Sequence, residues 1–446
     1  MARKDASMLE YLHLKGVGPA PTMELELARR LNVVTGDNGL GKSFLLDVAW
    51  WALTRTWPSY PALPYKEAAE ASIGFKVQGK VRDREYISRY DPRAQEWKGS
   101  SGRPVNPGLV LYAQVDGGFA VWDPARNYWR KVGNRDVQDR PPNYLFRPGD
   151  VWDGIEGESG MVCNGLIRDW VSWQLENGRA FKLLKAALKA MSPSEGEPLT
   201  PGKPRRISLD DVRDFPTVQM AYGQDVPVVH ASAGMRRIIA LVYLLVWAWE
   251  EHRKASELLG QAPTQQVIFL IDEIEAHLHP QWQRRVMSSL LAVVQEILAG
   301  DRADVQVLTA THSPLVLASL EPLFDEDQDA LWHFGIRDQT VRLEPIGWSK
   351  QGDAANWLVH ETFGLRQARS AQAERAIEAA EAFMRDDFDA LPTGLRTRER
   401  IDQELRRLLA GHDPFWPRWL VSGKGISSTE DKSAKRRRKP ALRGKT

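Results

Sequence analysis

The run Gly36-Asp37-Asn38-Gly39-Leu40-Gly41-Lys42-Ser43 restricts the fold of this chain more than any other feature. It fits the phosphate-binding pattern G-x-x-x-x-G-K-[ST], and it follows an apolar stretch (31–34) and opens a predicted helix (41–53), which is the context that the pattern requires. Glycines let the backbone curl so that its N–H groups point at phosphate oxygens, and the helix directs the positive end of its dipole at the same anion. We therefore expect this run to bind ATP, with Lys42 at the β- and γ-phosphates and the Ser43 hydroxyl on Mg²⁺.

A short apolar run at 267–271 ends in two carboxylates, Asp272 and Glu273. Such a run is typical of a strand buried in a parallel sheet. In this position we expect Asp272 to hold Mg²⁺ through its water shell and Glu273 to act as the general base on the attacking water. The alternative, acids at an ordinary solvated strand end, is less favoured because the phosphate-binding run is present in the same chain.

Two further features indicate which kind of nucleotide-binding protein this is. Ser232 and Gly234 begin a long predicted helix (234–259), where they form a second anion site that can serve a phosphate on a partner subunit. An ordinary serine cap is the alternative. His312 follows a predicted strand (305–311) and is placed to hydrogen-bond the γ-phosphate, although a lone histidine is equally often structural.

These motifs occur in the order Gly-Asp-Asn-Gly-Leu-Gly-Lys-Ser, Ala-Ser-Ala-Gly-Met-Arg-Arg, Ile-Asp-Glu-Ile-Glu-Ala-His-Leu-His-Pro and Thr-His-Ser-Pro. As a set, across about 9–320, they resemble the ABC-type ATPases of the OLD/RecF-like group, which are AAA-family relatives of the SMC proteins. The resemblance implies an α/β fold of the ABC-type P-loop NTPases, with a split catalytic domain, an inserted α/β subdomain and a helical C-terminal region.

The resemblance also implies a homodimer or higher homo-oligomer in which each ATP lies between the P-loop of one subunit and the signature motif of the other. By position Ser232 and Gly234 match the signature, 275–280 the D-loop and His312 the switch histidine. Gln114 matches the Q-loop glutamine, a ligand of Mg²⁺. The signature departs from the family pattern, because alanines replace the usual Leu and Gly on either side of Ser232.

Changes in pattern along the chain predict five segments. They are the P-loop half of the ATPase domain (1–56), an inserted subdomain (57–207), the second half with signature, carboxylates and switch histidine (208–348), a helical partner-docking region (349–422) and a disordered basic tail (423–446). The inserted segment alternates short β-like runs with Pro- and Gly-rich loops, and it contains a helical stretch at 165–191. The docking region carries predicted helices at 367–388 and 395–410. Three aromatic residues among prolines at 413–419 suit a docking segment better than a core strand, and local packing against the ATPase stays open as the alternative.

The motifs that would make this chain a nuclease are missing from it. The residues after His312 contain no apolar strand followed by an Asp-x-Asp pattern, and no HNH-like or HExxH motif is present. Heptads long enough for an SMC-like coiled coil are also missing. The arrangement of an ATPase domain followed by a helical region without nuclease motifs then resembles the PtuA-like ATPase subunits of Septu anti-phage systems, which act with a separate HNH nuclease. Two alternatives stay open: a DNA repair or chromosome-maintenance ATPase that acts on DNA directly, and a nucleotide-dependent scaffold with little turnover.

The net charge of +2 conceals an uneven distribution. Residues 424–446 hold nine basic and two acidic side chains, so the tail carries +7 and the remaining chain −5. Such a tail suits either non-specific nucleic-acid contact or solubility. The N-terminus has no apolar signal segment, the longest apolar run (238–249) is too short to span a bilayer, and Cys163 is the single cysteine, so we expect a cytoplasmic protein without membrane contact.

Overall fold

The computed structural model describes residues 8–65, 70–77, 85–99, 106–133, 135–138, 142–158, 160–298 and 303–424. The chain divides into two compact units, Met1–Trp357 and Leu358–Thr446. In the described residues the first unit contains two large β-sheets, four small sheets of two or three short strands, and helices, and the second unit is helical.

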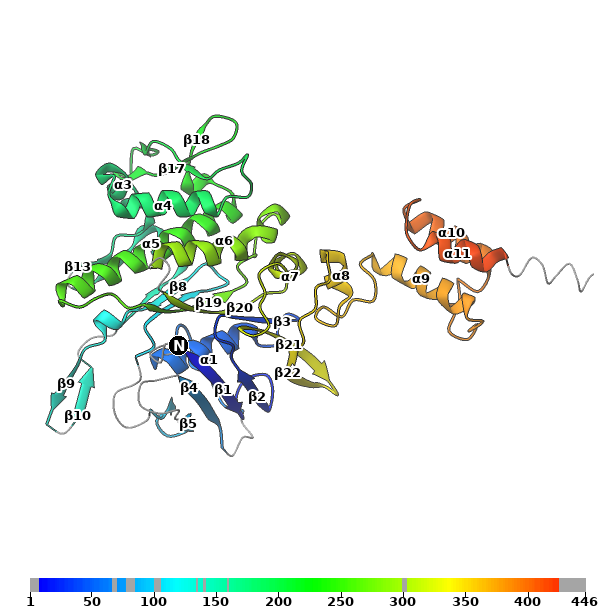
Figure 1. Cartoon of the computed structure of the whole chain (residues 1–446), viewed down its shortest axis with the longest axis horizontal. Helices are drawn as coiled ribbons and strands as arrows, with labels where there is room; N and C mark the ends of the chain where they lie inside the picture. Colours follow the sequence, from blue (N-terminus) through cyan, green and yellow to red (C-terminus); the bar gives the residue numbers. More distant parts are fainter. Residues whose placement is uncertain are drawn as a thin grey trace, which may run out of the picture. The chain divides into compact units, whose positions relative to one another are not determined.

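An eight-stranded mixed sheet forms the centre of the first unit (Figure 1). Its five inner strands, in the order β7-β19-β20-β3-β21, run parallel, and antiparallel strands complete both edges. Because parallel strands end at one edge of a sheet, the loops after β3, β19 and β20 meet there. The strands in spatial order are β11 (Asn143–Phe146), β8 (Phe119–Trp122), β7 (Leu109–Ala113), β19 (Gln266–Asp272), β20 (Asp304–Ala310), β3 (Leu31–Gly36), β21 (Asp329–Arg337) and β22 (Thr340–Ile346).

A second, antiparallel sheet lies on the far side of α1 (Lys42–Thr54) from the first. Helix α1 touches strands of both sheets, and its apolar side chains join them in one buried core cluster that includes Leu45, Val48 and Trp50. The helix that begins at the phosphate-binding run is therefore buried over its length. The strands of this sheet in spatial order are β2 (Thr22–Glu26), β1 (Leu9–Lys15), β4 (Ser72–Val77), β5 (Glu85–Asp91) and β6 (Glu96–Trp97).

Helices cover the other face of the eight-stranded sheet (Figure 1). Helices α5 (Ala233–Leu258), α6 (Pro280–Leu298) and α7 (Pro314–Leu320) follow one another across it, and α3 (Leu166–Glu176) and α4 (Arg179–Ala190) pack on α5. The remaining short elements of this unit are η1 (Pro124–Arg126), β9 (Trp129–Val132), β10 (Arg135–Gln138), α2 (Pro148–Asp153), β12 (Ile155–Gly157), β13 (Gly160–Cys163), β14 (Thr200–Pro201), β15 (Arg205–Arg206), β16 (Asp214–Phe215), β17 (Thr217–Gln219), β18 (Asp225–Pro227), η2 (Val228–His230) and α8 (Ala354–Val359), which crosses the boundary between the units.

The structure adds detail to the segments expected from the sequence. The segment 57–207 supplies β4, β5 and β6 to the antiparallel sheet and β7, β8 and β11 to the mixed sheet, in addition to helices. The apolar stretch at 31–34 lies in β3, and Asn32 exchanges hydrogen bonds with the backbone of Ala28, which holds the turn between β2 and β3. The helical stretch expected over 165–191 breaks at Asn177, whose left-handed backbone (φ 50°) ends α3.

The second unit contains α9 (Ala371–Met384), α10 (Arg398–Leu408) and α11 (Trp416–Lys424). The predicted helices 367–388 and 395–410 are confirmed as α9 and α10, each shorter at its ends. Phe415 and Trp419 are buried in the core that these helices share, and the Trp419 indole donates to Asp402 Oδ1 (2.9 Å). Two of the three aromatics expected to dock a partner are thus held by local packing, the alternative reading of that segment.

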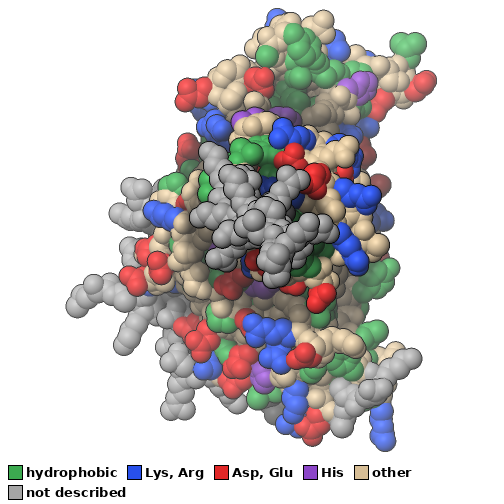
Figure 2. Space-filling view, turned by 90° about the vertical axis from the view of Figure 1, so that its right-hand side faces the viewer, with side chains coloured by type: hydrophobic (Ala, Val, Ile, Leu, Met, Phe, Trp, Pro, Cys, Tyr) green, Lys and Arg blue, Asp and Glu red, His purple; other side chains and the backbone are tan. Residues whose placement is uncertain are grey.

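Membrane contact and surface charge both bear on the partners that the chain can have. No described helix is both long enough and apolar enough to cross a membrane. Figure 2 shows one face on which the coloured basic and acidic side chains are interspersed. Of the tail expected at 423–446, Gly423 and Lys424 belong to α11, and the rest lies outside the described residues.

Candidate functional site

The phosphate-binding run forms a tight loop between β3 and α1. Gly36 and Gly41 have left-handed backbones (φ 136° and 99°) in places where a side chain has no room. A Cβ on Gly36 would lie 2.5 Å from the Phe334 carbonyl oxygen, and one on Gly41 would lie 2.4 Å from a Pro19 ring carbon. Both positions therefore require glycine, and the loop curls as the motif predicts.

The Lys42 side chain lies across this loop. It is 5% exposed, and its Nζ donates to the carbonyl oxygens of Gly36 (2.9 Å) and Asp37 (3.0 Å). These two neutral acceptors hold the ammonium at the start of α1. The positive end of the helix dipole lies at the same place, so the ammonium and the dipole both favour a bound anion. The loop thus keeps one full positive charge beside its backbone N–H groups.

Asp272 is the buried carboxylate of the site. It ends β19, is 1% exposed, and accepts a hydrogen bond from the Ser43 side chain. Its Oδ1 atom is buried and has no hydrogen-bond partner among the described residues. Burial, reinforced by the charge of Glu273, raises the pKa of Asp272 to about 6. A buried carboxylate oxygen without a donor is a ready ligand for a cation or its water shell, and Mg²⁺ takes such oxygens.

Glu273 and His312 meet at the same edge of the sheet. The Nδ1 atom of His312 lies 3.0 Å from Glu273 Oε1, and the side chains are 42% and 18% exposed, respectively. Glu273 has a left-handed backbone (φ 48°), and its N–H donates to the Ala310 carbonyl on the neighbouring strand (3.0 Å). A carboxylate and an imidazole in contact, half-open to solvent, can move a proton from a water molecule.

Glu275 contributes to this geometry, and the motifs did not single it out. It is 3% exposed, and its Oε1 accepts from the Thr311 hydroxyl (2.6 Å) and from the His312 N–H (3.0 Å). The second carboxylate oxygen is buried without a partner in the described part of the chain. Glu275 therefore fixes the turn that carries His312. The sequence signals for it were its place at the start of the expected D-loop (275–280) and its spacing, two residues after Glu273.

Arg237 is the second contributor that the motifs did not identify. It lies on α5, and its guanidinium donates to the carbonyl oxygens of Asp272 (3.1 Å), Glu273 (2.9 Å) and Val115 (2.7 Å). Burial lowers its pKa, and the nearby carboxylates oppose that shift. One side chain thus connects the start of α5 to the end of β19 and to the β7–β8 turn. Its targets are backbone atoms, so no pattern of side chains predicts it.

Ser232 and Gly234 lie at the start of α5. Ser232 is exposed and caps the helix, accepting from the Met235 N–H (3.3 Å). Gly234 is buried, and a Cβ there would lie 2.9 Å from the His277 carbonyl oxygen. Within the described residues, no hydrogen bond or ion pair joins Ser232 or Gly234 to the phosphate-binding loop of the same chain.

Gln114 lies beside the start of α5. It follows β7, whose neighbour in the sheet is β19, and its N–H closes the β7–β8 turn on Gly118 O (3.0 Å). Together with Ala233, Arg236 and His277 it lines a cavity of about 340 Å³. The structure therefore brings Gln114 together with the signature segment and, through Arg237, with the end of β19.

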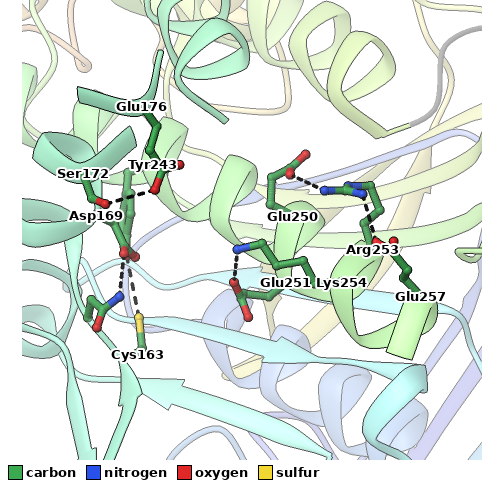
Figure 3. Close-up of polar contacts among 11 residues, drawn as sticks. Cys163, Asp169, Ser172, Glu176, Tyr243, Glu250, Glu251, Arg253, Lys254 and Glu257 are labelled. Carbon is green, nitrogen blue, oxygen red and sulfur yellow. Dashed lines mark hydrogen bonds and ion pairs between the residues drawn. The ribbon is translucent and has the colours of Figure 1, made fainter. Parts of the chain in front are cut away.

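Polar contacts anchor α5 to the helices above it. Figure 3 shows Tyr243 of α5 directed at Asp169 of α3, with a hydrogen bond of 2.8 Å, and Cys163 Sγ 3.7 Å from the Tyr243 hydroxyl. Burial raises the pKa of Asp169 and raises that of Cys163 to about 11. Further along the helix, buried Glu250 pairs with Arg179 of α4 (3.1 Å). These contacts hold the helix that carries the signature residues in register with α3 and α4.

Comparison with known proteins identifies relatives of the chain. A family model described as "AAA domain, putative AbiEii toxin, Type IV TA system" matches residues 31–318, a range that contains Lys42, Asp272, Glu273 and His312. The Septu protein PtuA of Bacillus thuringiensis is 21% identical over 373 residues, which are 81% of this chain and 86% of that protein.

Two solved structures are also similar to the chain. The SMC head domain from Thermotoga maritima is 14% identical, with 76% of this chain and 100% of that chain covered and a TM-score of 0.34. The recombination mediator protein RecF in its ATP form is 11% identical, with 78% and 99% covered and a TM-score of 0.37.

Proposed function

The chain belongs to the AAA-domain family that matches its residues 31–318, as its motifs predicted, and we propose that it binds and hydrolyses ATP as one subunit of an anti-phage defence complex. The observation that carries the ATPase proposal is one edge of the sheet, where the loop holding Lys42, the Asp272 carboxylate and the Glu273–His312 pair lie together. The similarity to the Septu protein PtuA supports the defence role. The proposal places the protein in the cytoplasm.

Nucleotide binding follows from the loop. The backbone N–H groups of 36–43 would surround the phosphates, and Lys42 would exchange its two carbonyl acceptors for phosphate oxygens. Ser43 and Asp272 would hold Mg²⁺, with Gln114 as the further ligand that the family pattern assigns. Bound Mg²⁺ would supply positive charge that offsets the charge of the β- and γ-phosphates.

Hydrolysis requires a base for the attacking water. Glu273 would accept the proton as the water oxygen attacks the γ-phosphorus and the bond to the β-phosphate oxygen breaks. His312, held against Glu273 Oε1, would orient that carboxylate and donate to the γ-phosphate. Glu275 and Arg237 would keep both groups in position through backbone hydrogen bonds.

The proposed complex has three further interfaces. A second copy of the chain would bring Ser232 and Gly234 to the nucleotide in a head-to-tail homodimer. The helical region 349–422 would dock a separate effector nuclease, and the basic tail (423–446) would contact nucleic acid. The segments 1–56 and 208–348 would act as the two halves of the ATPase, with 57–207 between them.

Phage plating tests the defence role. In cells carrying the chain with its neighbouring genes, Lys42→Ala and Glu273→Gln should each abolish protection, while an exposed control such as Arg93→Ala should retain it. The proposed role fails if both site variants protect as well as the unmodified chain at matched expression.

A further inference from the structure

A tryptophan-lined pocket lies at the end of α1 opposite the phosphate-binding loop. Its volume is about 290 Å³, close to the lower limit for sites that hold small ligands. Four indoles contribute to its walls, from α1, β6, β8 and β9: Trp51, Trp97, Trp122 and Trp129. Nothing in the ATPase chemistry above uses these side chains.

Arg55 brings a positive charge into this pocket. It caps α1 with a left-handed backbone (φ 62°), and its N–H donates to the Trp51 carbonyl (2.8 Å). Its guanidinium lies 4.1 Å from the Phe75 ring centre and 5.1 Å from that of Trp51. Among the described residues it has no hydrogen-bond or ion-pair partner, and burial lowers its pKa to about 10. A largely buried guanidinium with free N–H groups favours an anionic ligand.

The other polar groups of the pocket favour a ligand that accepts hydrogen bonds. The Trp122 indole N–H is buried and lacks an acceptor within the described ranges. Asn127 Oδ1 already accepts from the Trp129 indole (2.7 Å) and from the Gln138 amide (3.0 Å), which fixes that wall. No lining residue is Asp or Glu, so an aromatic cage for a cation is disfavoured.

We propose that this pocket binds one nucleoside phosphate unit, with the base among the indoles of Trp51, Trp97 and Trp129 and the phosphate on Arg55. These residues together select a ligand that has a planar ring to stack on indoles, hydrogen-bond acceptors on the edge of that ring, and a negatively charged group. The unit comes either from a free mononucleotide or from a single-stranded nucleic acid.

The pocket is distinct from the ATP site. Lys42 begins α1 and Arg55 follows its last residue, so the 13-residue helix separates them by about 20 Å at 1.5 Å per residue. A ligand here therefore does not occupy the phosphate-binding loop, and the two sites can be tested separately. The inference goes beyond the proposed ATPase function and does not depend on hydrolysis.

The test uses the full-length chain carrying Lys42→Ala, which disables the ATP site. Two probes are titrated: AMP by calorimetry, and a fluorescein-labelled twelve-nucleotide oligo-dT by fluorescence anisotropy. Adding Arg55→Gln or Trp129→Ala should weaken binding at least about fivefold, because stacking of a base on one aromatic side chain contributes about 1–3 kcal/mol. Matched controls are Lys98→Gln, a cation beside Trp97 that does not line the pocket, and Trp57→Ala, a neighbour of Trp51 outside it.

The outcomes separate the two sources. Binding of AMP that depends on Arg55 assigns the pocket to free nucleotides, and binding of the oligonucleotide alone assigns it to a single strand. The proposal is overturned if the control variants lose as much affinity as Arg55→Gln and Trp129→Ala. It is also overturned if neither probe binds.

A second measurement leaves the pocket unmutated, in case its variants fold poorly. The Lys42→Ala chain is cross-linked by ultraviolet light to an oligonucleotide containing 4-thiothymidine, and the linked peptides are sequenced. The proposal predicts cross-links within 51–57, 97–99 or 122–138. Cross-links confined to other segments, the basic tail included, contradict it.

Discussion

At the scale of single residues, burial determines the charge state of the carboxylates around the site. Asp47, one turn after Ser43 on α1, accepts a hydrogen bond from the Tyr112 hydroxyl (3.0 Å). Desolvation raises its pKa to about 6, and the nearby charge of Asp272 adds to that shift. Two carboxylates with raised pKa values therefore lie close together below the loop, and at neutral pH their ionised forms destabilise the fold.

Asp47→Asn should stabilise the protein in a pH-dependent way. In the folded state the pKa of Asp47 is about 6, against about 3.9 for an unperturbed aspartate, so stability is lost as pH rises from about 4 to about 6 and stays low above it. Asparagine keeps the acceptor for Tyr112 and removes the charge. The variant should unfold with a free energy on the order of 1–2 kcal/mol higher at pH 8, and with about a third of that difference near pH 4.5.

Denaturant unfolding at the two pH values checks this prediction. Asp91→Asn is a control of opposite sign, because Lys98 lowers the pKa of the partly buried Asp91 and the charge of that carboxylate is favourable. An increase for Asp47→Asn of equal size at both pH values would show that its ionisation is not the cause.

At the scale of elements, α5 connects the parts of the site. Its first turn carries Ser232 and packs Gly234 against the His277 carbonyl, and its second turn places Arg237 on the carbonyls that follow β19. Tyr243 then fixes the helix to α3. A shift of α5 along its axis would therefore change the signature segment and the carboxylate strand together.

Gly234→Ala tests the close contact at the start of α5. The added Cβ would lie 2.9 Å from the His277 carbonyl oxygen, so the helix or the turn must move. We expect a loss of about 1–3 kcal/mol in unfolding free energy, the usual range for overpacking, and a lower rate of ATP turnover. Gly149→Ala is the matched control, because nothing lies within 4 Å of its Cβ position. Equal effects from both substitutions would rule out this contact as the reason for glycine at position 234.

The sequence predicted elements well where one pattern decides them. The motif run predicted the loop and α1, and continuous apolar runs predicted β19 and β20 within a residue or two. It could not predict that β7 and β8 join the main sheet, because β7 pairs with β19 through residues 158 positions apart, such as Leu109 and Val267. Glu275 and Arg237 were missed for a related reason: both act on backbone atoms brought close only by folding.

At the scale of the whole molecule, the account predicts a composite site between two copies. Ser232 is exposed and, within the described residues, makes no hydrogen bond to the loop of its own chain, as expected if it serves a partner. With ATP and Mg²⁺, a Glu273→Gln chain should shift from monomer to dimer in sedimentation velocity. Adding Ser232→Arg should prevent that shift, whereas Ser232→Asn, which keeps a capping oxygen, should preserve it. A dimer that forms equally with Ser232→Arg would contradict head-to-tail assembly.

ATP turnover by the purified chain tests the central claim most directly. The unmodified protein should hydrolyse ATP in the presence of Mg²⁺, and Glu273→Gln should lower the rate at least about a hundredfold, the scale of a general base, while ATP binds within about threefold of the original affinity. Lys42→Ala should lose binding itself. Unchanged turnover in Glu273→Gln, or no turnover in the unmodified protein with ATP bound, would contradict the claim that this site hydrolyses ATP.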